Sequence, residues 1–376
     1  MSPRSGPGRI VHCADYGGPY SGSFVPMLSA SAAAASEHGY ETTICFSEVA
    51  RSRPWLDELD GLADIRFIER TGIRGVMRQL SRVLSEGNGS PAVLHTHFGT
   101  FDEAAALLGV RRRHTAVLSH LHSGNPRPVR LRSKAYGAVM GHLVDGVICV
   151  SREVYDQARA RAVPASKLIL LPNAIDPERF PPITPDERAE ARRALNLAPE
   201  AEVVLHFAWD WHIKGGDRML TVADAMATRT NTTFLTVVSE HRAGVPADEL
   251  ERRPNVRALG PRDNVNELYA AADAFLNCSR AEGGLPYAVI EALARGLPAV
   301  VTDPPVRPEL VAGLPGGRAV DPQTPAIASA VGEVLALTQP ERDGHAAAAR
   351  ARVCESYALA PWARRLVGVY DGALER

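Results

Sequence analysis

Short apolar runs alternate with segments of helical length along most of this chain, and that alternation constrains its fold more than any other feature. The runs are apolar at nearly every position, as expected for strands of a parallel sheet that helices cover on both faces. In the first half the runs are residues 10–13, 42–46, 93–97, 115–120, 146–150 and 168–171, with helical segments that include 24–37, 73–85 and 152–162. In the second half they are residues 203–207, 234–238, 256–259, 274–277 and 299–302. The sequence therefore predicts an α/β fold.

One segment interrupts the alternation, with five prolines between Pro172 and Pro185, and is typical of an interdomain linker. The length of 376 residues is about two and a half times the ~150 residues of a common domain. We therefore predict two tandem Rossmann-like, doubly wound domains, residues 1–178 and 179–357, facing a cleft. Ligands of open parallel sheets bind beyond the carboxyl ends of the strands, so the loops after strands are the places to look for a site.

Composition excludes several classes of protein. Apolar residues make up 45% and charged residues 23%, as in an ordinary folded chain, and 42 Lys and Arg against 43 Asp and Glu indicate no nucleic-acid partner. The five cysteines lack CxxC spacing, which indicates neither a disulfide framework nor a zinc site and favours a reducing cytoplasm. The sequence contains neither a signal-peptide core nor an apolar run near the ~18 residues of a membrane span. We expect a cytoplasmic protein whose contact with a membrane, if any, is peripheral.

The strongest candidate site element is residues 277–303, NCSRAEGGLPYAVIEALARGLPAVVTD. A predicted strand end leads into a loop with Glu282 and two glycines, and Pro286 stands where the first turn of a helix favours proline. Free N–H groups at such a helix start favour a phosphate ligand, whereas Glu282 and Glu291 suit pairs of hydroxyl groups. The element predicts a ligand with both phosphate and sugar diols. An ordinary exposed helix N-terminus is the alternative.

A second element, residues 205–220, places Lys214 at a glycine-rich turn between a strand and a helix. A lysine there can hold a compact positive charge against a diphosphate, and the chain has only two other lysines. A solvated lysine is the alternative. Trp209 and Trp211 alternate, so that one can pack while the other lines the cleft, although both could be core residues. GxGxxG and GxxxxGK[ST] motifs are absent, which counts against nicotinamide and simple NTPase functions.

Together these elements resemble the retaining GT-B glycosyltransferases of family 4, also described as group 1 glycosyltransferases. The resemblance rests on PNAID at 172–176, KGGD at 214–217, and EGGLP at 282–286 followed by Glu291, and it covers nearly the whole chain. It implies a GT-B fold in which a C-terminal helix, about residues 358–376, crosses back to the first domain. That segment carries a helical apolar stripe that needs a surface to cover.

The resemblance also implies roles for individual residues. Lys214 would hold the donor diphosphate, Glu282 and His122 would lie beside the transferred sugar as catalytic residues, and Glu291 would bind the ribose. Further donor contacts are assigned to Gly22, Ser23, Trp209, Gly215, Gly283, Gly284 and Leu285. The two glutamates are nine positions apart where the family usually has eight, and the arginine that normally precedes the lysine is absent. The diphosphate charge must then be met by Lys214, the helix N–H groups or a cation from elsewhere.

The acceptor side is assigned to the first domain, with Tyr16, His97, Arg127 and Arg130. From Ala104 to His142 the sequence has no acidic residue but seven cations. This basic segment suits an anionic acceptor, or an anionic membrane surface contacted through residues 111–134. An ordinary solvated charged face is an equally good interpretation.

Four histidines form a candidate metal site. His95 and His97 project from one face of a predicted strand, and His120 and His122 do the same on the next, so a metal site is conceivable. The family works without a required metal, and such histidines are often satisfied core or cleft residues. We therefore assign no metal and no cofactor, with the nucleotide sugar acting as a co-substrate.

The resemblance implies retaining transfer of a hexosyl-type sugar from a nucleotide diphosphate sugar to a hydroxyl of a glycan, lipid-linked or secondary-metabolite acceptor. Two alternatives stay open. One is a nucleotide-sugar epimerase on a GT-B-like scaffold, and the other is a nucleotide-sugar-binding partner without catalytic activity.

Overall fold

The computed structural model describes residues 8–18, 21–87, 89–112, 114–124, 128–239, 245–262, 264–282, 284–304 and 308–375. By its internal contacts the chain divides into two units. The first unit consists of Met1–Ile175, Gly283–Leu285 and Leu359–Arg376, and the second of Asp176–Glu282 and Pro286–Ala358. The division at residue 175 falls inside the proline-containing segment. Each unit is described separately below.

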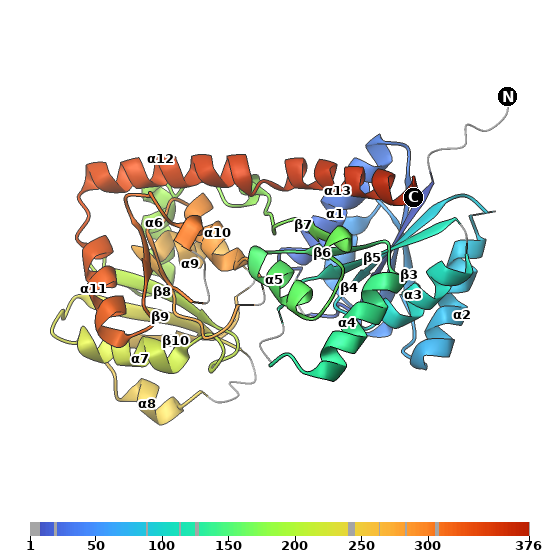
Figure 1. Cartoon of the computed structure of the whole chain (residues 1–376). Helices are drawn as coiled ribbons and strands as arrows, with labels where there is room; N and C mark the ends of the chain where they lie inside the picture. Colours follow the sequence, from blue (N-terminus) through green and yellow to red (C-terminus); the bar gives the residue numbers. More distant parts are fainter. Residues whose placement is uncertain are drawn as a thin grey trace. The chain divides into compact units, whose positions relative to one another are not determined.

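A parallel seven-stranded sheet forms the centre of the first unit, with the strand order β3-β2-β1-β4-β5-β6-β7. Strands β3 to β7 of this sheet are labelled in Figure 1. The strands are β1 (Arg9–Ala14), β2 (Glu41–Ser47), β3 (Asp64–Ile68), β4 (Ala92–His97), β5 (Thr115–Leu121), β6 (Gly146–Cys149) and β7 (Leu168–Leu170). The helices are α1 (Phe24–Glu37), α2 (Gly72–Ser85), α3 (Asp102–Arg111), α4 (Leu131–Leu143), α5 (Arg152–Ala160) and α13 (Leu359–Leu374), with short 3-10 turns η1 (Glu48–Ala50), η2 (Pro54–Leu59) and η3 (Ala165–Lys167).

Apolar side chains fill both faces of this sheet. Ile10 of β1 belongs to a core cluster with Leu28 of α1 and Trp362 of α13. The next residue of the same strand, Val11, belongs to the opposite cluster, which includes Leu80 of α2. Because successive residues of a strand face opposite sides, a sheet that is covered on both sides needs apolar residues at consecutive positions. This requirement explains the continuous apolar runs in the sequence.

The second unit is built on a parallel six-stranded sheet with the order β10-β9-β8-β11-β12-β13. Its strands are β8 (Glu202–Ala208), β9 (Thr232–Val238), β10 (Val256–Leu259), β11 (Ala274–Asn277), β12 (Ala299–Thr302) and β13 (Gly317–Val320). Its helices are α6 (Pro185–Ala194), α7 (Gly216–Ala225), α8 (Ala247–Glu251), α9 (Val265–Ala271), α10 (Tyr287–Ala294), α11 (Thr324–Leu335) and α12 (Gln339–Ser356), with 3-10 turns η4 (Pro177–Arg179) and η5 (Pro308–Leu310). The predicted α/β class with two Rossmann-like sheets is confirmed.

Two edge strands are absent from the prediction. Strand β3 has the sequence DIRFI, in which polar and apolar residues alternate and only Ile68 is fully buried. Strand β13 has the sequence GRAV and is half-buried throughout. An edge strand is covered less completely than a central one, so a search for continuous apolar runs misses it.

The C-terminal helix α13 belongs to the first unit and packs on α1. The four residues of its predicted apolar stripe are all buried: Trp362, Leu366, Val367 and Tyr370. Leu359 at its start donates its backbone N–H to the carbonyl oxygen of Ile175 at 2.8 Å. The predicted return of the C-terminal helix to the first domain is therefore confirmed.

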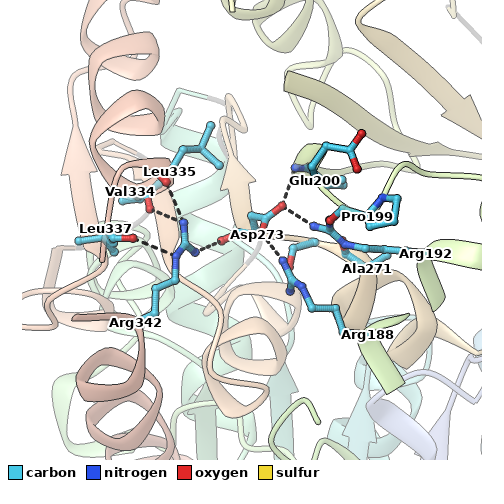
Figure 2. Close-up of polar contacts among 12 residues, drawn as sticks. Arg188, Arg192, Pro199, Glu200, Ala271, Asp273, Val334, Leu335, Leu337 and Arg342 are labelled. Atoms are coloured by element: carbon cyan, nitrogen blue, oxygen red, sulfur yellow. Dashed lines mark hydrogen bonds and ion pairs between the residues drawn. The ribbon is translucent and has the colours of Figure 1, made fainter. Parts of the chain in front are cut away.

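In the second unit, Asp273 is surrounded by arginines from two helices (Figure 2). Its carboxylate is paired with Arg188 and Arg192 of α6, and it accepts the backbone N–H of Val203 at 2.7 Å. Its carbonyl oxygen accepts from Arg342 of α12 at 3.1 Å. Asp273, directly before β11, thus joins α6, β8 and α12. It fixes the end of the sheet opposite to the loops that carry the predicted site.

Candidate active site

The predicted donor residues of the second unit gather beyond the carboxyl ends of two adjacent strands. Strands β8 and β11 pair in parallel, so the segments that follow them begin at the same edge of the sheet. Lys214 follows β8 and Glu282 follows β11. The Lys214 ammonium lies 2.7 Å from a carboxylate oxygen of Glu282, and the side chains are only 14% and 4% exposed. The fold therefore creates a nearly buried ion pair from two motifs that the sequence identified separately.

The turn that carries Lys214 is held tightly against β11. Asp210 accepts the backbone N–H of Ile213 at 2.8 Å, and His206 donates from Nε2 to the carbonyl oxygen of Lys214 at 3.0 Å. Gly215 has a φ of +73°, and a Cβ there would lie 2.1 Å from the carbonyl oxygen of Cys278. A glycine is required at this point because both the backbone conformation and the space exclude a side chain. Burial lowers the pKa of His206 to about 4, so that its ring stays neutral.

Three donors hold the Glu282 carboxylate in place. Besides Lys214, Asn277 donates from Nδ2 to Oε1 at 3.0 Å and Ser279 donates its hydroxyl to the same oxygen at 2.6 Å. A buried carboxylate needs such partners to remain ionised. Asn277 and Ser279 are not among the predicted site residues, although polar residues at the end of an apolar strand were a usable signal.

The two tryptophans after β8 have different environments. Trp211 is buried and packs against Gly216, whereas Trp209 is 62% exposed. The Lys214 ammonium lies 5.3 Å from the centre of the Trp209 ring, within the range of a cation–π interaction. This arrangement excludes the alternative in which both tryptophans are core residues, because most of the Trp209 side chain is exposed beside the ion pair.

The second glutamate, Glu291, lies on α10 at a different position. Its Oε2 accepts the hydroxyl of Tyr269 at 2.8 Å, and burial together with this carboxylate raises the pKa of Tyr269 well above its usual value. Helix α10 begins at Tyr287, directly after Pro286, and ends before Gly296. Among the described residues, no acidic side chain lies in its first turn. Its N-terminal N–H groups therefore keep their attraction for an anion.

The loop before α10 is only partly described. Gly283 lies outside the described residues. Gly284 and Leu285 group with the first unit, where Asn173 donates from Nδ2 to the carbonyl oxygen of Leu285 at 3.1 Å. A Cβ on Gly284 would lie 2.6 Å from a methyl group of Val150. Glycine at 284 is thus required by close packing within that unit.

Two further arginines of the second unit contact the segments that carry the ion pair. Arg218 donates to the carbonyl oxygens of Cys278 and Ser279 at 3.3 and 3.1 Å. Arg280 pairs through both its terminal nitrogens with Asp217. Burial raises the pKa of Asp217, but the hydrogen bonds and charge of Arg280 outweigh it and hold the pKa below its usual value. Arg218 and Arg280 are candidates for the cation that the missing arginine would have supplied.

The predicted residues of the first unit lie at the carboxyl ends of β1, β4 and β5. Tyr16 packs its ring against Phe24, and a Cβ on Gly22 would lie 3.5 Å from the Tyr16 hydroxyl. His97 and His122 are hydrogen-bonded, with 2.8 Å between Nδ1 of His97 and Nε2 of His122. His97 is fully buried, whereas His122 is partly exposed.

Three further assignments in the first unit are Ser23, Arg127 and Arg130. Ser23 directly precedes the first residue of α1, and its carbonyl oxygen accepts the N–H of Met27 at 3.3 Å. Arg130 precedes α4 and is exposed, with its backbone N–H donated to Ser133 at 2.8 Å. Arg127 lies outside the described residues.

The basic segment includes an exposed face of α4. Arg130, Arg132 and Lys134 are exposed, and beside them Leu131 is 86% exposed. Tyr136 and Val139, further along α4, are exposed as well. Within the described ranges, no helix has both the length and the apolar character needed to cross a membrane.

Two family models match the chain. A model described as Glycosyltransferase Family 4 matches residues 30–179, and one described as Glycosyl transferases group 1 matches residues 202–337. The chain belongs to the family 4 glycosyltransferases. The matches fall on the two sheets in turn, which agrees with the resemblance that the motifs indicated.

This family 4 glycosyltransferase is similar to two proteins that act on lipopolysaccharide. It is 28% identical to the lipopolysaccharide core biosynthesis mannosyltransferase LpsB of Rhizobium meliloti over 216 residues, 54% of this chain and 60% of LpsB. It is 27% identical to the lipopolysaccharide glucosyltransferase WaaG of Escherichia coli over 161 residues, 42% of this chain and 43% of WaaG. The matched region thus spans less than two thirds of either relative.

Among solved structures, HepE of Anabaena in complex with UDP has a similar fold. The TM-score is 0.79 at 16% identity, over 97% of this chain and all of that chain. HepE has also been solved with UDP-glucose. At this level of identity the likeness concerns the fold, and it supports the GT-B assignment of this family 4 glycosyltransferase.

Proposed function

We propose that this protein transfers a hexosyl-type sugar, with retention of configuration, from a nucleotide diphosphate sugar to a hydroxyl group of an acceptor. The observation that carries the proposal is the ion pair between Lys214 and Glu282, fixed beyond the ends of β8 and β11 with both side chains nearly buried. An ammonium and a carboxylate side by side suit a ligand whose diphosphate is joined to a sugar. The UDP and UDP-glucose complexes of HepE support a nucleotide sugar as the donor.

The parts of the donor are assigned to different residues. Lys214 contacts the diphosphate, and the N–H groups at the start of α10 add to its stabilisation. Glu282 accepts hydrogen bonds from the hydroxyl groups of the sugar, and Glu291 accepts those of the ribose. Trp209 covers one face of the donor. Gly22, Ser23, Gly215, Gly283, Gly284 and Leu285 are assigned to contact the donor through their backbone.

Bond breaking develops negative charge on the departing phosphate, and Lys214 is placed to stabilise it. A preorganised charge of this kind is commonly the largest contribution to catalysis. In front-face substitution the acceptor oxygen forms the new bond to the anomeric carbon on the side that the phosphate leaves, and the phosphate takes the acceptor proton. No protein base is needed for that step. With Lys214, Arg218 and α10 at the diphosphate, the reaction needs no metal ion.

The acceptor is assigned to the first unit, with Tyr16, Arg127 and Arg130; His97, which is fully buried, acts on this side through its hydrogen bond to His122. LpsB and WaaG act in lipopolysaccharide biosynthesis, which supports a glycan or lipid-linked acceptor over a secondary metabolite. The exposed cations of the basic segment suit an acceptor that carries phosphate or carboxylate groups.

The same surface is proposed to dock on an anionic membrane. Leu131, Tyr136 and Val139 offer apolar contact, while Arg130, Arg132 and Lys134 offer positive charge. Apolar and cationic groups on one helix are the combination that binds the interface of an anionic bilayer. The five cysteines are free, which fits the reducing cytoplasmic side of that membrane.

The test is a panel of UDP-, GDP- and dTDP-sugars measured by melting-temperature shift and by nucleotide release. We expect one nucleotide class to raise the melting temperature, and Lys214→Ala to lose about 10²–10³ in release rate, the scale for removal of one preorganised donor. Lys167→Ala is the matched control because Lys167 belongs to the first unit, whereas the ion pair belongs to the second.

Each alternative predicts a different result in this panel. Formation of an epimer of the nucleotide sugar without acceptor would support the epimerase, and binding without transfer to any acceptor would support the non-catalytic partner. If no nucleotide sugar binds, the proposal is wrong.

A further inference from the structure

Five histidines lie on one face of the first unit's sheet. Four of them occupy alternate positions of three neighbouring strands: His12 on β1, His95 and His97 on β4, and His120 on β5. His122 directly follows β5. The register aligns His12 with His95, and His97 with His120. The residues share the face that α1 and α13 cover, and all except His122 are fully buried.

The ring nitrogens of three of these histidines form one chain. Nδ1 of His12 lies 3.0 Å from Nε2 of His97, and Nδ1 of His97 lies 2.8 Å from Nε2 of His122. His97 therefore uses each of its two nitrogens in one hydrogen bond. The chain begins in the core at His12 and ends at the partly exposed His122.

The other two histidines form a second chain with a tyrosine. Nδ1 of His95 lies 2.9 Å from the hydroxyl of Tyr370 on α13, and Nε2 of His95 lies 3.2 Å from Nδ1 of His120. No ring nitrogen is shared between the two chains. A metal ion would need three or more nitrogens to converge on one point at about 2.0–2.1 Å from it. Ring nitrogens of His12, His95 and His97, and those of His97, His120 and His122, lie within 4.8 Å of one another, so a metal ion is the competing ligand of these rings. The nitrogens of the two chains nevertheless meet in pairs at 2.8–3.2 Å, which is the distance of a hydrogen bond.

All three rings of the first chain are neutral. Burial lowers the pKa of His12 and of His122 to about 3, and burial with the neighbouring imidazoles lowers that of His97 well below its usual value. A neutral imidazole has one N–H and one lone pair. Since His97 hydrogen-bonds through both nitrogens, it donates to one neighbour and accepts from the other. The N–H groups of the chain therefore all point the same way.

The environment of His12, at the buried end of the three hydrogen-bonded histidines, decides which way their N–H groups point. Nε2 of His12 is buried and has no hydrogen-bond partner within the described part of the chain. A buried N–H without an acceptor is more costly than a lone pair without a donor. His12 therefore keeps its proton on Nδ1 and donates to His97, and His97 donates in turn to Nε2 of His122. The remaining N–H of the chain is then on Nδ1 of His122.

We propose that His12 and His97 are positioning residues that hold His122 as the neutral tautomer with its proton on Nδ1. This inference rests on the proposed role of His122 beside the transferred sugar, where the fixed tautomer supplies an N–H donor to an oxygen of the donor substrate and cannot act as a base through Nε2. The second chain, which contains His95, takes no part.

The test is the histidine NMR spectrum of the full-length protein labelled with ¹³C and ¹⁵N in its histidines, in which carbon shifts distinguish the two tautomers. Loss of one signal set in His122→Gln assigns His122. In the wild type we expect the Nδ1–H tautomer. His97→Leu removes the donor and should allow the other tautomer, whereas His97→Asn places an amide N–H near the position of Nδ1 and should restore the first. His95→Leu is the matched control, with equal burial on the same strand.

Nucleotide release gives the second readout. We expect about a tenfold loss in His97→Leu, the scale of one oriented hydrogen bond, with recovery in His97→Asn. An Nε2–H tautomer in the wild type, or an unchanged tautomer in His97→Leu, would overturn the inference even if sugar transfer is found. Stoichiometric Zn²⁺ binding that shifts the His12, His97 and His122 signals would overturn it as well. Absence of transfer with the expected tautomers would refute the proposed function of His122 and leave the tautomer assignment in place.

Discussion

Lys214 and Glu282 are 68 residues apart in the chain, yet 2.7 Å separates their charged groups. Each is nearly buried, so each depends on the other for compensation of its charge. The pair therefore contributes to stability as well as to the proposed catalysis, and the two contributions can be measured separately.

Loss of one member of the pair should cost more stability than loss of both. Lys214→Met leaves Glu282 with Asn277 and Ser279 as its donors, and we expect a loss of about 3 kcal/mol in the free energy of unfolding, at the lower end for a broken buried pair. The double variant Lys214→Met/Glu282→Gln should recover part of that loss. Urea unfolding measures both. Equal losses in the single and double variants would contradict a buried ion pair.

The glycine at 215 should tolerate no side chain. Gly215 and Gly61 have the same φ of +73°, but only at Gly215 would a Cβ meet another atom, the Cys278 carbonyl oxygen at 2.1 Å. We expect Gly61→Ala to lose about 1 kcal/mol from backbone strain alone, and Gly215→Ala to lose 1–3 kcal/mol more, the usual range for overpacking. Thermal unfolding compares the two. Similar melting temperatures would show that the turn after β8 can move away from β11.

Acid should destabilise the protein before its carboxylates titrate. The pKa of His12 and of His122 is lowered to about 3, and that of His206 to about 4. In the unfolded chain these rings take up protons below about pH 6.5, whereas in the folded protein they do not. The unfolded state then binds more protons, and stability falls with decreasing pH by up to about 1.4 kcal/mol per pH unit for each histidine.

His95, a buried histidine of the second hydrogen-bonded chain, gives a direct test of this pH dependence. The pKa of His95 is lowered well below its usual value by burial and by neighbouring histidines. Removal of its imidazole in His95→Leu should reduce the slope of unfolding free energy between pH 6.5 and 4.5 by about one proton. Urea unfolding at several pH values measures the slope. A slope that does not change would mean that the ring is protonated in the folded protein.

The exposed face of α4 should govern binding to anionic vesicles. Leu131→Asp places a charge at an 86% exposed apolar position beside Arg130 and Arg132, and should abolish partition onto vesicles that contain an anionic phospholipid. Val49→Asp is the control because Val49 is also exposed but lies outside the basic segment. Sedimentation with vesicles measures partition, which should weaken as salt is added. Equal partition of the two variants would leave α4 as an ordinary solvated face.

The central strands were predictable from the sequence because burial on two faces requires apolar residues at consecutive positions. Strands β3 and β13 were not predicted, because their edge positions allow polar residues. These are Asp64 and Arg66 in β3 and Arg318 in β13. Lys214 and Glu282 were predicted from the glycine-rich turns that carry them and from the family resemblance.

Supporting contacts were harder to predict. His12 is aligned with His95 only through the register of β1 and β4, and Tyr370 reaches His95 from the far end of the chain. Such relationships depend on strand order and on the return of α13, and neither leaves a local signal in the sequence. Asn277 and Ser279, two of the three donors to Glu282, in contrast lie within five residues of it.

The return of α13 also affects the order in which the protein can form. Trp362 and Tyr370 complete a core that begins at Ile10. The whole second unit is synthesised after Ile10 and before these two residues. The first unit therefore waits on the ribosome with part of its apolar face uncovered until the last helix has been made. During that interval the apolar side chains that α13 later covers are exposed, and exposed apolar surface of this kind favours aggregation.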